Sequence, residues 1–438
     1  MRVRFWGTRG SIAAPGPETV RYGGNTPCVE VETADGTLII LDCGTGARKL
    51  GVQLAQRGTR RAHIFIGHTH SDHIQGLPFL VPALPPGSQV TVYGPAGIDR
   101  SFPRAISGQM DYAYFPVPIT HIAAELDFQE LGEEEFAVGT VKVQTQYLNH
   151  TAPCLGYRIE SGGASLVYAT DHEPNAETLW RADRAPRDYS PSAMLHAADS
   201  RHAEFLHAAD LVIHDSQYLA SEYPQKVRWG HSTMEYTVDV AVAARTRRLA
   251  LFHHDPFRTD VALDRLLADA TERAARAGSS IEILAASEGM ELALAEQGRS
   301  TIAERGPQAP LLPTRPRILV AEDDDGVAET LKSVLEDDGY EIRRARDGVA
   351  AVNLLGEVPF DLVLLDLEMP GMDGFDVCRA VRSDKRLDTL PILVLTVHSD
   401  PRDIMAGFEA GVTDYMIKPF SEAQLRARTR SWLTRSSR

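Results

Sequence analysis

Five short apolar runs in the first two thirds of the chain each end at a residue that can bind a metal ion. The first run leads into the cluster HTHSDH at 68–73, in which three imidazoles and a carboxylate fall within six residues. The later runs end at His150, at Asp171, at the pair His214-Asp215 and at His253. Runs of this length that are rich in Val, Ile, Leu and Tyr are typical of buried strands, so these polar side chains are expected where strands end. The pattern predicts a metal site at a sheet edge.

Composition limits the classes of protein to which the chain can belong. Its 438 residues, 43% of them hydrophobic and 24% charged, are enough for two or three domains with separate cores. There is no apolar run of about 18 residues and no signal-peptide pattern, so we expect a cytoplasmic protein without a membrane partner. Four scattered cysteines without CxxC spacing fit a reducing compartment. The formal charge of −15 disfavours a broad nucleic-acid-binding surface.

A polar, proline-rich stretch at 297–316 divides the chain. It contains Pro307, Pro310, Pro313 and Pro316, so it cannot continue a helix and is expected to be a semi-extended linker. We therefore predict one domain at 1–296 and a second at 317–438. In the second domain strand and helix patterns alternate, which predicts a doubly wound parallel sheet with helices on both faces.

The first domain is predicted to mix strands and helices. Runs at 28–33 and 37–41 flank the turn signal Ala34-Asp35-Gly36, which predicts a hairpin. Helical patterns follow at 235–244 and 262–275. The glycine-rich turn at 42–46 has no lysine directly after its last glycine, so a structural turn in which Asp42 fixes backbone amides near the site is favoured over phosphate binding.

Residues of about 1–295 resemble the metallo-β-lactamase fold superfamily. The cluster at 68–73 matches the HxHxDH signature of that superfamily in full, and the downstream His150, Asp171 and His253 follow in the expected order. The resemblance implies an α/β fold, an αββα sandwich of two sheets covered by helices, with the site at the edge of the sandwich. Its implied ligands for one divalent metal are His68, His70 and His150. Those for the second metal are Asp72, His73 and His253, and Asp171 bridges the two.

The ligand types suit zinc or manganese, and two such cations supply a nucleophilic water at neutral pH. Further motifs resemble the branch that contains ribonuclease Z and the cyclic-phosphate phosphodiesterases: GTRGS at 7–11, Asn25-Thr26, YATD at 168–171 and GHST at 230–233. In that branch a histidine held by an acidic residue protonates the leaving alkoxide. His231 matches the histidine, and Asp215 stands where the branch usually has glutamate. Asp72 is expected to orient the nucleophile.

The acidic chain lacks a lysine-rich insertion, so a small phosphodiester is favoured over RNA as the substrate, with a ribonuclease Z-like nuclease as an alternative. Aromatic residues in the insertion at 77–131 either wall the pocket or pack over the sheet: Tyr93, Phe102, Tyr112, Tyr114 and Phe115. Other histidines are expected to be ordinary hydrogen-bonded residues: His63, His121, His172, His196, His202 and His207. His214 and His254 are intermediate cases.

Residues 317–438 resemble the response-regulator receiver domain over their whole length. Four apolar runs end in order at Glu322-Asp323, at Asp366, at Thr396 and at Lys418. The resemblance implies a magnesium ion held by Glu322, Asp323, Asp366 and the backbone carbonyl of Glu368. Asp366 is the implied phosphoacceptor and Lys418 pairs with the phosphoryl oxygens. Thr396 and Tyr415 are the implied switch residues, and Pro419 is expected to follow a cis peptide bond.

A receiver joined to an enzyme-like domain predicts a two-component response regulator with an enzymatic output. The sequence contains no kinase domain, so a sensor histidine kinase, a phosphotransfer protein or a small donor must supply the phosphoryl group. We expect phosphorylation of Asp366 to alter access to the metal site or to pair two protomers as a homodimer. The alternative is a signalling adaptor or phosphate sink whose metal domain is not catalytic.

Overall fold

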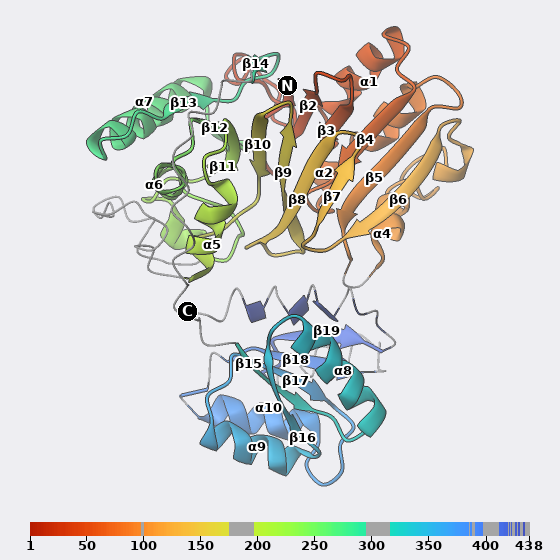
Figure 1. Ribbon diagram of the computed structural model, residues 1–438, viewed down its shortest axis with the longest axis vertical. Coiled ribbons are helices and arrows are strands. Elements are labelled where there is room, and N and C mark those ends of the chain that lie inside the picture. Colours follow the sequence, from red (N-terminus) through yellow and green to blue (C-terminus); the bar gives the residue numbers. More distant parts are fainter. Residues whose placement is uncertain are drawn as a thin grey trace. The chain divides into compact units, whose positions relative to one another are not determined.

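The computed structural model describes residues 1–97, 100–174, 197–294, 316–384, 386–387, 390–396 and 411–418, with scattered positions from 420 to 433. It divides into two compact units, Met1–Gly298 and Arg299–Arg438 (Figure 1). The expected linker, apart from Pro316, lies outside the described residues. Among the described residues, no helix is both long and apolar enough to cross a membrane.

The first sheet of the N-terminal unit has the strand order β14-β1-β2-β3-β4-β5-β6. Its strands are β1 Arg2–Gly7, β2 Cys28–Glu32, β3 Leu38–Leu41, β4 Arg61–Phe65, β5 Gln89–Pro95, β6 Glu125–Leu131 and β14 Glu291–Ala293. Strands β2 and β3 form the predicted antiparallel hairpin. Strands β3 to β6 are parallel, so the chain leaves β3 and β4 at the same edge of the sheet. The glycine-rich turn and the histidine cluster follow these two strands.

The second sheet has the order β13-β12-β11-β10-β9-β8-β7. Its strands are β7 Glu135–Val138, β8 Val141–Leu148, β9 Cys154–Ser161, β10 Ala164–Ala169, β11 Leu211–Asp215, β12 Arg248–Phe252 and β13 Glu282–Ala285. Strands β10 to β13 are parallel, so their carboxyl ends share one edge. The strands that the apolar runs predicted before the ligand-type residues are therefore confirmed.

Apolar side chains from both sheets form one core between them. Phe5 of the first sheet packs against Phe252 of the second with ring centroids 6.0 Å apart, and Phe65 packs against Tyr157 at 5.1 Å. All four side chains are buried. Burial of one such ring contributes about 1.5–3 kcal/mol, so this layer fixes the two sheets face to face and sets the positions of the strand ends.

Helices cover the outer face of each sheet, which completes the predicted αββα sandwich (Figure 1). Those over the first sheet are α1 Ala47–Gln56, α2 Ser71–Ile74, α3 Leu77–Leu80 and α4 Phe102–Gly108. Those over the second are α5 Ala197–Leu206, α6 Met234–Ala243 and α7 Asp260–Arg276. The side chains of Thr233 and Thr259 accept hydrogen bonds from the backbone at the starts of α6 and α7. Such caps satisfy otherwise unpaired amides and define where each helix begins.

The insertion at 77–131 contains elements that the apolar pattern did not predict. Besides β5, α4 and β6 it includes the short 3₁₀ helices η1 Val81–Ala83 and η2 Ile119–His121. Tyr93 stacks on Phe65 with centroids 4.6 Å apart, and Phe102 is buried, so both pack against the sheet. Tyr112 and Tyr114 are 88% and 81% exposed. The five aromatic residues therefore do not form one wall.

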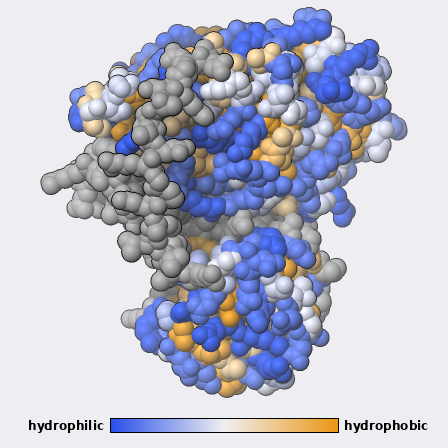
Figure 2. Space-filling view, in the orientation of Figure 1, coloured by the Kyte–Doolittle hydropathy of each residue, from blue (hydrophilic) through white to orange (hydrophobic). Residues whose placement is uncertain are grey.

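The C-terminal unit contains a parallel sheet in the order β16-β15-β17-β18-β19. Its strands are β15 Arg317–Ala321, β16 Glu341–Ala345, β17 Leu362–Asp366, β18 Ile392–Thr396 and β19 Asp414–Ile417. The helices that the structure describes in full are α8 Asp325–Asp337, α9 Gly348–Glu357 and α10 Gly374–Ser383. Separate apolar clusters lie on the two faces of the sheet. The predicted doubly wound fold is therefore confirmed. The face of each unit that Figure 2 shows is mainly hydrophilic, with apolar residues scattered over it.

Candidate active site

The seven predicted metal ligands lie together in the segments that follow β4, β8, β10 and β12, with Asp72 and His73 in helix α2. Within each of two groups, the ligand atoms lie no more than 4.8 Å apart. The first group is His68, His70, His150 and Asp171, and the second is Asp72, His73 and His253. Asp171 lies between the groups: its Oδ2 is 3.3 Å from His68 Nε2 and its Oδ1 is 3.1 Å from His253 Nε2. The structure thus brings both predicted ligand sets around one shared carboxylate.

The backbone at this sheet edge is held in an uncommon conformation. Asp171 and His253 have φ of 58° and 57°, and Asp42, at the end of β3, has φ of 56°. Residues other than glycine seldom adopt this left-handed region, and such positions concentrate at functional sites. The conformation directs the chain away from the sheet directly after each strand, with the acid or imidazole left at the edge.

Four of the candidate ligands are histidines whose Nε2 atom faces the centre of the site. The other ring nitrogen, Nδ1, of each one contacts a neighbouring residue. His73 Nδ1 donates to Asp42 Oδ2 at 2.7 Å, His150 Nδ1 donates to the Gly230 carbonyl at 2.8 Å, and His253 Nδ1 donates to Gln217 Oε1 at 2.9 Å. His68 Nδ1 lies 3.8 Å from Cys154 Sγ. A proton held on Nδ1 leaves Nε2 with a lone pair, so these partners set which atom of each ring faces inward.

The inner atoms fit divalent cations. His68 Nε2 and His73 Nε2 are buried without a hydrogen-bond partner among the described residues. His150 Nε2 lies 3.1 Å from His70 Nδ1 and 3.7 Å from Asp171 Oδ2. Lone pairs that face one another in a buried site destabilise it unless a positive charge lies between them. Imidazole nitrogens and carboxylate oxygens are suitable ligands for such a cation, so the donor set fits the metals that the sequence predicts.

Burial and mutual charge set the protonation states of the ligands. Burial lowers the pKa of His150 to about 3 and holds the pKa of His68 well below its usual range, so both rings are neutral near neutral pH. For Asp171, burial opposes the charge, but the histidines around it outweigh burial and hold its pKa well below the usual range. Neutral imidazoles with an ionised carboxylate are the forms that bind metals.

His231 and Asp215 form the predicted pair beside the metal ligands. His231 Nδ1 donates to Asp215 Oδ2 at 3.0 Å, so the aspartate, although shorter than glutamate, reaches the imidazole. Asp215 is itself fixed by backbone amides, with Gln217 N at 2.9 Å and Ser232 N at 3.2 Å. The His231 ring stacks on that of His253 with centroids 4.9 Å apart. Burial acts to lower the pKa of His231, but Asp215 outweighs it and raises the pKa to about 9.

Two acidic residues support the site from outside the predicted ligand set. Asp42 accepts hydrogen bonds from Gly67 N at 2.7 Å and from Tyr168 Oη at 2.6 Å, in addition to its bond from His73. The sequence predicts that Asp42 fixes backbone amides, but its contact with His73 was not predicted. The second is Glu173, which was missed altogether. It accepts from Arg228 N at 2.6 Å and Gly230 N at 2.9 Å, and thereby holds the loop that carries His231.

Three of the remaining histidines form a buried cluster behind the site. The rings of His172 and His202 stack with centroids 3.9 Å apart, and His202 Nε2 lies 2.9 Å from His214 Nε2. His172 Nε2 donates to Tyr236 Oη at 3.0 Å, and Tyr236 Oη donates to Asp199 at 2.9 Å. Burial lowers the pKa of all three histidines, so they are neutral hydrogen-bonding residues. Their contacts suit a packing role.

In the C-terminal unit, acidic side chains converge at the carboxyl ends of the parallel strands. Glu322, Asp323 and Asp366 place one oxygen each within 4.8 Å of the others. Lys418 Nζ lies 2.8 Å from Asp366 Oδ2 and 2.9 Å from Glu322 Oε2. Burial opposes the charge of Lys418, but these hydrogen bonds outweigh it and raise its pKa. Oxygen ligands of this kind fit magnesium.

The other predicted receiver residues lie at the same edge. Thr396 is buried at the end of β18, and its carbonyl accepts a hydrogen bond from Lys418 N at 2.7 Å. Glu368 N donates to Asp366 Oδ1 at 3.3 Å, in the loop whose carbonyl was the predicted magnesium ligand. Pro419 and the side chain of Tyr415 lie outside the described residues.

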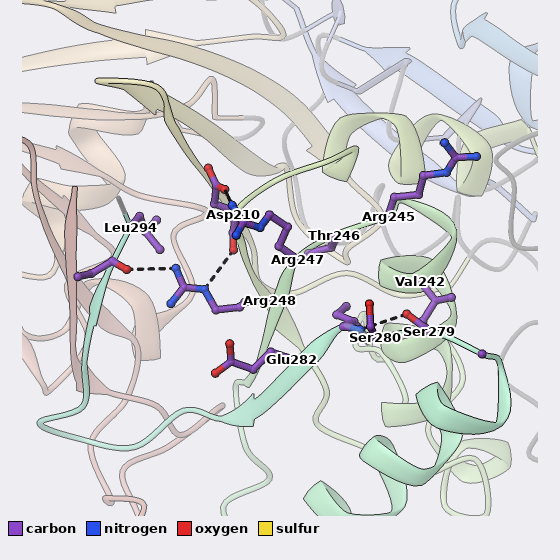
Figure 3. A pocket seen from close by; sticks show the side chains of 13 residues that line it. Asp210, Val242, Arg245, Thr246, Arg247, Arg248, Ser279, Ser280, Glu282 and Leu294 are labelled. Atoms are coloured by element: carbon purple, nitrogen blue, oxygen red, sulfur yellow. Dashed lines mark hydrogen bonds and ion pairs between the residues drawn. The ribbon is translucent and has the colours of Figure 1, made fainter. Parts of the chain in front are cut away.

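A polar cleft of about 700 Å³ lies at the other ends of the same strands, and Figure 3 shows its lining. Asp210, Arg248 and Glu282 come from the amino ends of β11, β12 and β13, whereas the metal ligands follow carboxyl ends. Arg247 pairs with Asp210 at 2.9 Å, and Arg248 donates to the Ala293 carbonyl at 3.2 Å. Arg247 and Arg248 therefore take part in structural contacts away from the metal site.

The fold and the two candidate sites define a protein of two domains. The first is a sandwich of metallo-β-lactamase type, and the second is a doubly wound domain of receiver type. Residues 37–254 match the family described as the beta-lactamase superfamily domain, and residues 318–430 match the response regulator receiver domain. The chain is a response-regulator receiver domain fused to a metallo-β-lactamase-fold domain, as its motifs predicted.

Three known proteins that the chain resembles each match one of its two domains. Over 122 residues the chain is 44% identical to the DNA-binding response regulator MtrA of Mycolicibacterium paratuberculosis, a match over 28% of this chain and 53% of that protein. The chain thus spans about half the length of the curated relatives it matches. The structure of a putative response regulator from Chloroflexus aurantiacus is 41% identical, over 27% of this chain and 98% of that one, with a TM-score of 0.27. Human tRNase Z, short form, is 19% identical over 67% of this chain and 100% of that one, with a TM-score of 0.46.

Proposed function

We propose that the N-terminal domain is a binuclear-metal hydrolase, a phosphodiesterase for a small phosphodiester, controlled by phosphorylation of Asp366. The observation that carries the proposal is the convergence of the Nε2 atoms of His68 and His150 on the Asp171 carboxylate, at 3.3 Å and 3.7 Å. His68, His70 and His150 would hold one cation, Asp72, His73 and His253 would hold the other, and Asp171 would contact both. Zinc and manganese suit this donor set.

When bound, the two cations supply a water of lowered pKa and a clamp on the phosphoryl oxygen. Asp72 is placed to orient the attacking water. Its Oδ2 accepts from the Ser11 amide at 2.8 Å and lies 3.2 Å from His253 Nε2, so the carboxylate is fixed. A fixed carboxylate aligns a nucleophile without a further loss of entropy.

His231 is placed to hold the proton that the leaving alkoxide takes up. Its Nδ1 proton is committed to Asp215, so Nε2 is the atom that delivers a proton to the substrate. The Asp215 contact keeps the ring in one orientation and favours its protonated form. A general acid of this kind accelerates the reaction by roughly a hundredfold to ten-thousandfold.

Two observations favour a phosphodiester as the substrate, and the charge of the chain favours a small one. The motifs of the N-terminal domain resemble the phosphodiesterase branch, and the pair His231–Asp215 is assembled beside the ligands. The formal charge of −15 repels long polyanions such as RNA.

The receiver supplies the proposed control. Asp366, bound by Lys418, would accept a phosphoryl group from a sensor histidine kinase or phosphotransfer protein in the presence of magnesium. The new phosphoryl oxygens would then take over the Lys418 contact, which changes the hydrogen bonds at the ends of β17 and β19. Such a change would alter access to the metal site or pair two protomers.

Hydrolysis of bis(p-nitrophenyl) phosphate by zinc- or manganese-loaded full-length protein tests the proposal. We expect turnover that is lost in Asp72→Ala and kept in His121→Ala, a change at an exposed histidine of η2. Beryllofluoride, which mimics a phosphoryl group on Asp366, should change the rate. Absence of turnover with both metals bound would overturn the hydrolase proposal, and an unchanged rate at full beryllofluoride occupancy would overturn the control.

A further inference from the structure

The side chain of Gln217 is buried beside the predicted ligands of the second cation. Gln217 lies just beyond the end of β11 and is 3% exposed. Its Oε1 accepts a hydrogen bond from His253 Nδ1 at 2.9 Å, and its Nε2 donates to Ser11 Oγ and to Tyr218 Oη, each at 3.3 Å. Both ends of the amide have partners, so the direction in which its oxygen points is fixed.

The contact with His253 acts directly on a predicted ligand. His253 Nε2 lies 3.2 Å from Asp72 Oδ2 and 3.1 Å from Asp171 Oδ1, so this nitrogen faces the other ligands. An imidazole that binds metal through Nε2 carries its proton on Nδ1, and the partner of that proton sets the orientation of the ring. Gln217 Oε1 is the acceptor for this proton, so it holds the ring as metal binding requires.

A second path leads from Gln217 to Asp72 through Ser11. The Ser11 hydroxyl accepts from Gln217 Nε2, and the Ser11 amide donates to Asp72 Oδ2 at 2.8 Å. Ser11 has φ of 61°, a conformation that residues other than glycine seldom adopt unless their surroundings hold them there. Gln217 thus contacts one predicted ligand and also the residue that fixes another.

The backbone of Gln217 serves the proposed proton donor instead. Gln217 N donates to Asp215 Oδ1 at 2.9 Å, and Asp215 Oδ2 accepts from His231 Nδ1. A substitution of the side chain leaves this amide in place. The contacts that Gln217 makes toward the metal ligands can therefore be removed while the pair His231–Asp215 keeps its backbone support.

The histidines of the first ligand group have other partners. His68 Nδ1 lies 3.8 Å from Cys154 Sγ, and His150 Nδ1 donates to the Gly230 carbonyl at 2.8 Å. Loss of the Gln217 amide should therefore disturb the two metal positions unequally. Removal of an outer partner of this kind lowers metal affinity by about 10- to 100-fold.

We propose that Gln217 is a positioning residue for the second cation, acting on His253 directly and on Asp72 through Ser11. The inference rests on the proposed binuclear site and adds the residue that fixes the geometry of one half of it. Gln217 acts through the ligands and is not itself a ligand. Its role depends on an oxygen that faces His253 Nδ1, so a glutamate at this position should replace it and an apolar side chain should not.

Stepwise zinc binding to the full-length protein tests this inference. Competition with a chromogenic chelator measures each affinity, in excess magnesium so that the receiver cluster holds magnesium. We expect the wild type to bind two zinc ions in the N-terminal domain. In Gln217→Leu, one should bind with the wild-type Kd and the other roughly 10- to 100-fold more weakly. Gln217→Glu keeps the acceptor and should keep both affinities.

Ser11→Ala provides a second variant that leaves the buried amide in place. It removes only the hydroxyl that accepts from Gln217 Nε2, so it should weaken the same single zinc ion by a smaller factor. Gln53→Leu is the matched control, because the Gln53 amide accepts from Arg57 Nη2 at 3.1 Å near the end of α1. Both zinc affinities should equal those of the wild type in this control.

Wild-type affinities for both zinc ions in Gln217→Leu would overturn the inference alone. Equal weakening of both ions would assign Gln217 a general structural role, which also overturns it. If Gln217→Leu does not fold, unchanged affinities in Ser11→Ala would decide against the inference. Binding of fewer than two zinc ions by the wild-type domain would overturn the proposed binuclear site, and the inference with it.

Discussion

Asp171 Oδ2 lies 3.3 Å from His68 Nε2, and both side chains are buried. Burial keeps the His68 ring neutral, and its Nε2 has no hydrogen-bond partner in the described part of the protein. A cation bound by these two atoms would stabilise them in a buried site. This contact is the structural reason to expect that the candidate ligands identified in the sequence bind metal.

Metal should therefore stabilise the N-terminal domain strongly. We expect excess zinc to raise its thermal midpoint, because a ligand that binds only the folded state at about a thousand times Kd adds about 4 kcal/mol. Calorimetry of full-length protein with chelator and with zinc measures the shift for the N-terminal transition. Asp171→Asn should lose most of the shift, whereas His121→Asn should keep it. An equal shift in Asp171→Asn would refute the role of the shared carboxylate.

His231→Gln should slow hydrolysis without emptying the metal site. The side chain pairs with Asp215 and is absent from the predicted ligand set, so its loss removes proton delivery and leaves the ligands in place. We expect kcat to fall by roughly a hundredfold or more while metal content, measured by elemental analysis, stays at the wild-type value. Asp215→Asn should show a smaller loss of the same kind. A drop in bound metal in His231→Gln would indicate that the ring is a ligand instead.

The buried histidines behind the site should make the fold sensitive to acid. Burial lowers the folded-state pKa of His202, so the unfolded chain takes up a proton at about pH 6.5 before the folded chain does. Stability is therefore independent of this group above pH 6.5 and falls as the pH drops below it, by at most about 1.4 kcal/mol per pH unit for one proton. Urea unfolding of metal-free protein from pH 8 to pH 5 measures the slope.

Metal-free protein is used because acid also releases metal from the ligands. His202→Gln removes one titrating group and should flatten the decline below pH 6.5. His121→Gln removes an exposed histidine and should leave the slope as in the wild type. An unchanged slope in His202→Gln would show that this ring does not resist protonation in the folded state.

The sequence predicted the strands, and it placed the candidate ligands at the strand ends, because both patterns lie within short stretches of the chain. Apolar runs define β8, β10, β11 and β12, and the candidate ligands or their neighbours lie at the ends of these strands. Contacts between distant residues could not be predicted in the same way. His68 meets Cys154 across 86 positions, and Lys226 is aligned by two aromatic rings on either side of it in the chain. Edge strand β6 was missed because its mostly exposed, charged sequence lacks the apolar run of a buried strand.

Phosphorylation of the receiver should depend on its acidic cluster as well as on Asp366. One carboxylate oxygen each from Glu322, Asp323 and Asp366 lies within 4.8 Å of the others. A magnesium ion bound by these oxygens would offset the negative charge of an incoming phosphoryl group. Incubation of full-length protein with acetyl phosphate should add one phosphoryl group by mass only when magnesium is present. Asp366→Asn should abolish the addition and Asp323→Asn should reduce it. Addition at an equal rate in chelator would contradict a magnesium site at this cluster.

Gly230→Ala should weaken zinc binding, an effect that backbone strain at this position would not produce by itself. Gly230 has φ of 84°, and a Cβ at this position would overlap His150 Nδ1, the atom that donates to the Gly230 carbonyl. The ring would have to move, and its Nε2 with it, so we expect weaker zinc binding together with a loss of roughly 1–3 kcal/mol of stability. Gly289→Ala is the matched control, because Gly289 has φ of 86° and no atom within 4 Å of an added Cβ. It carries the same backbone strain but should bind zinc as the wild type does. If competition with a chromogenic chelator gives equal zinc affinities for the two variants, the Gly230 carbonyl does not position His150.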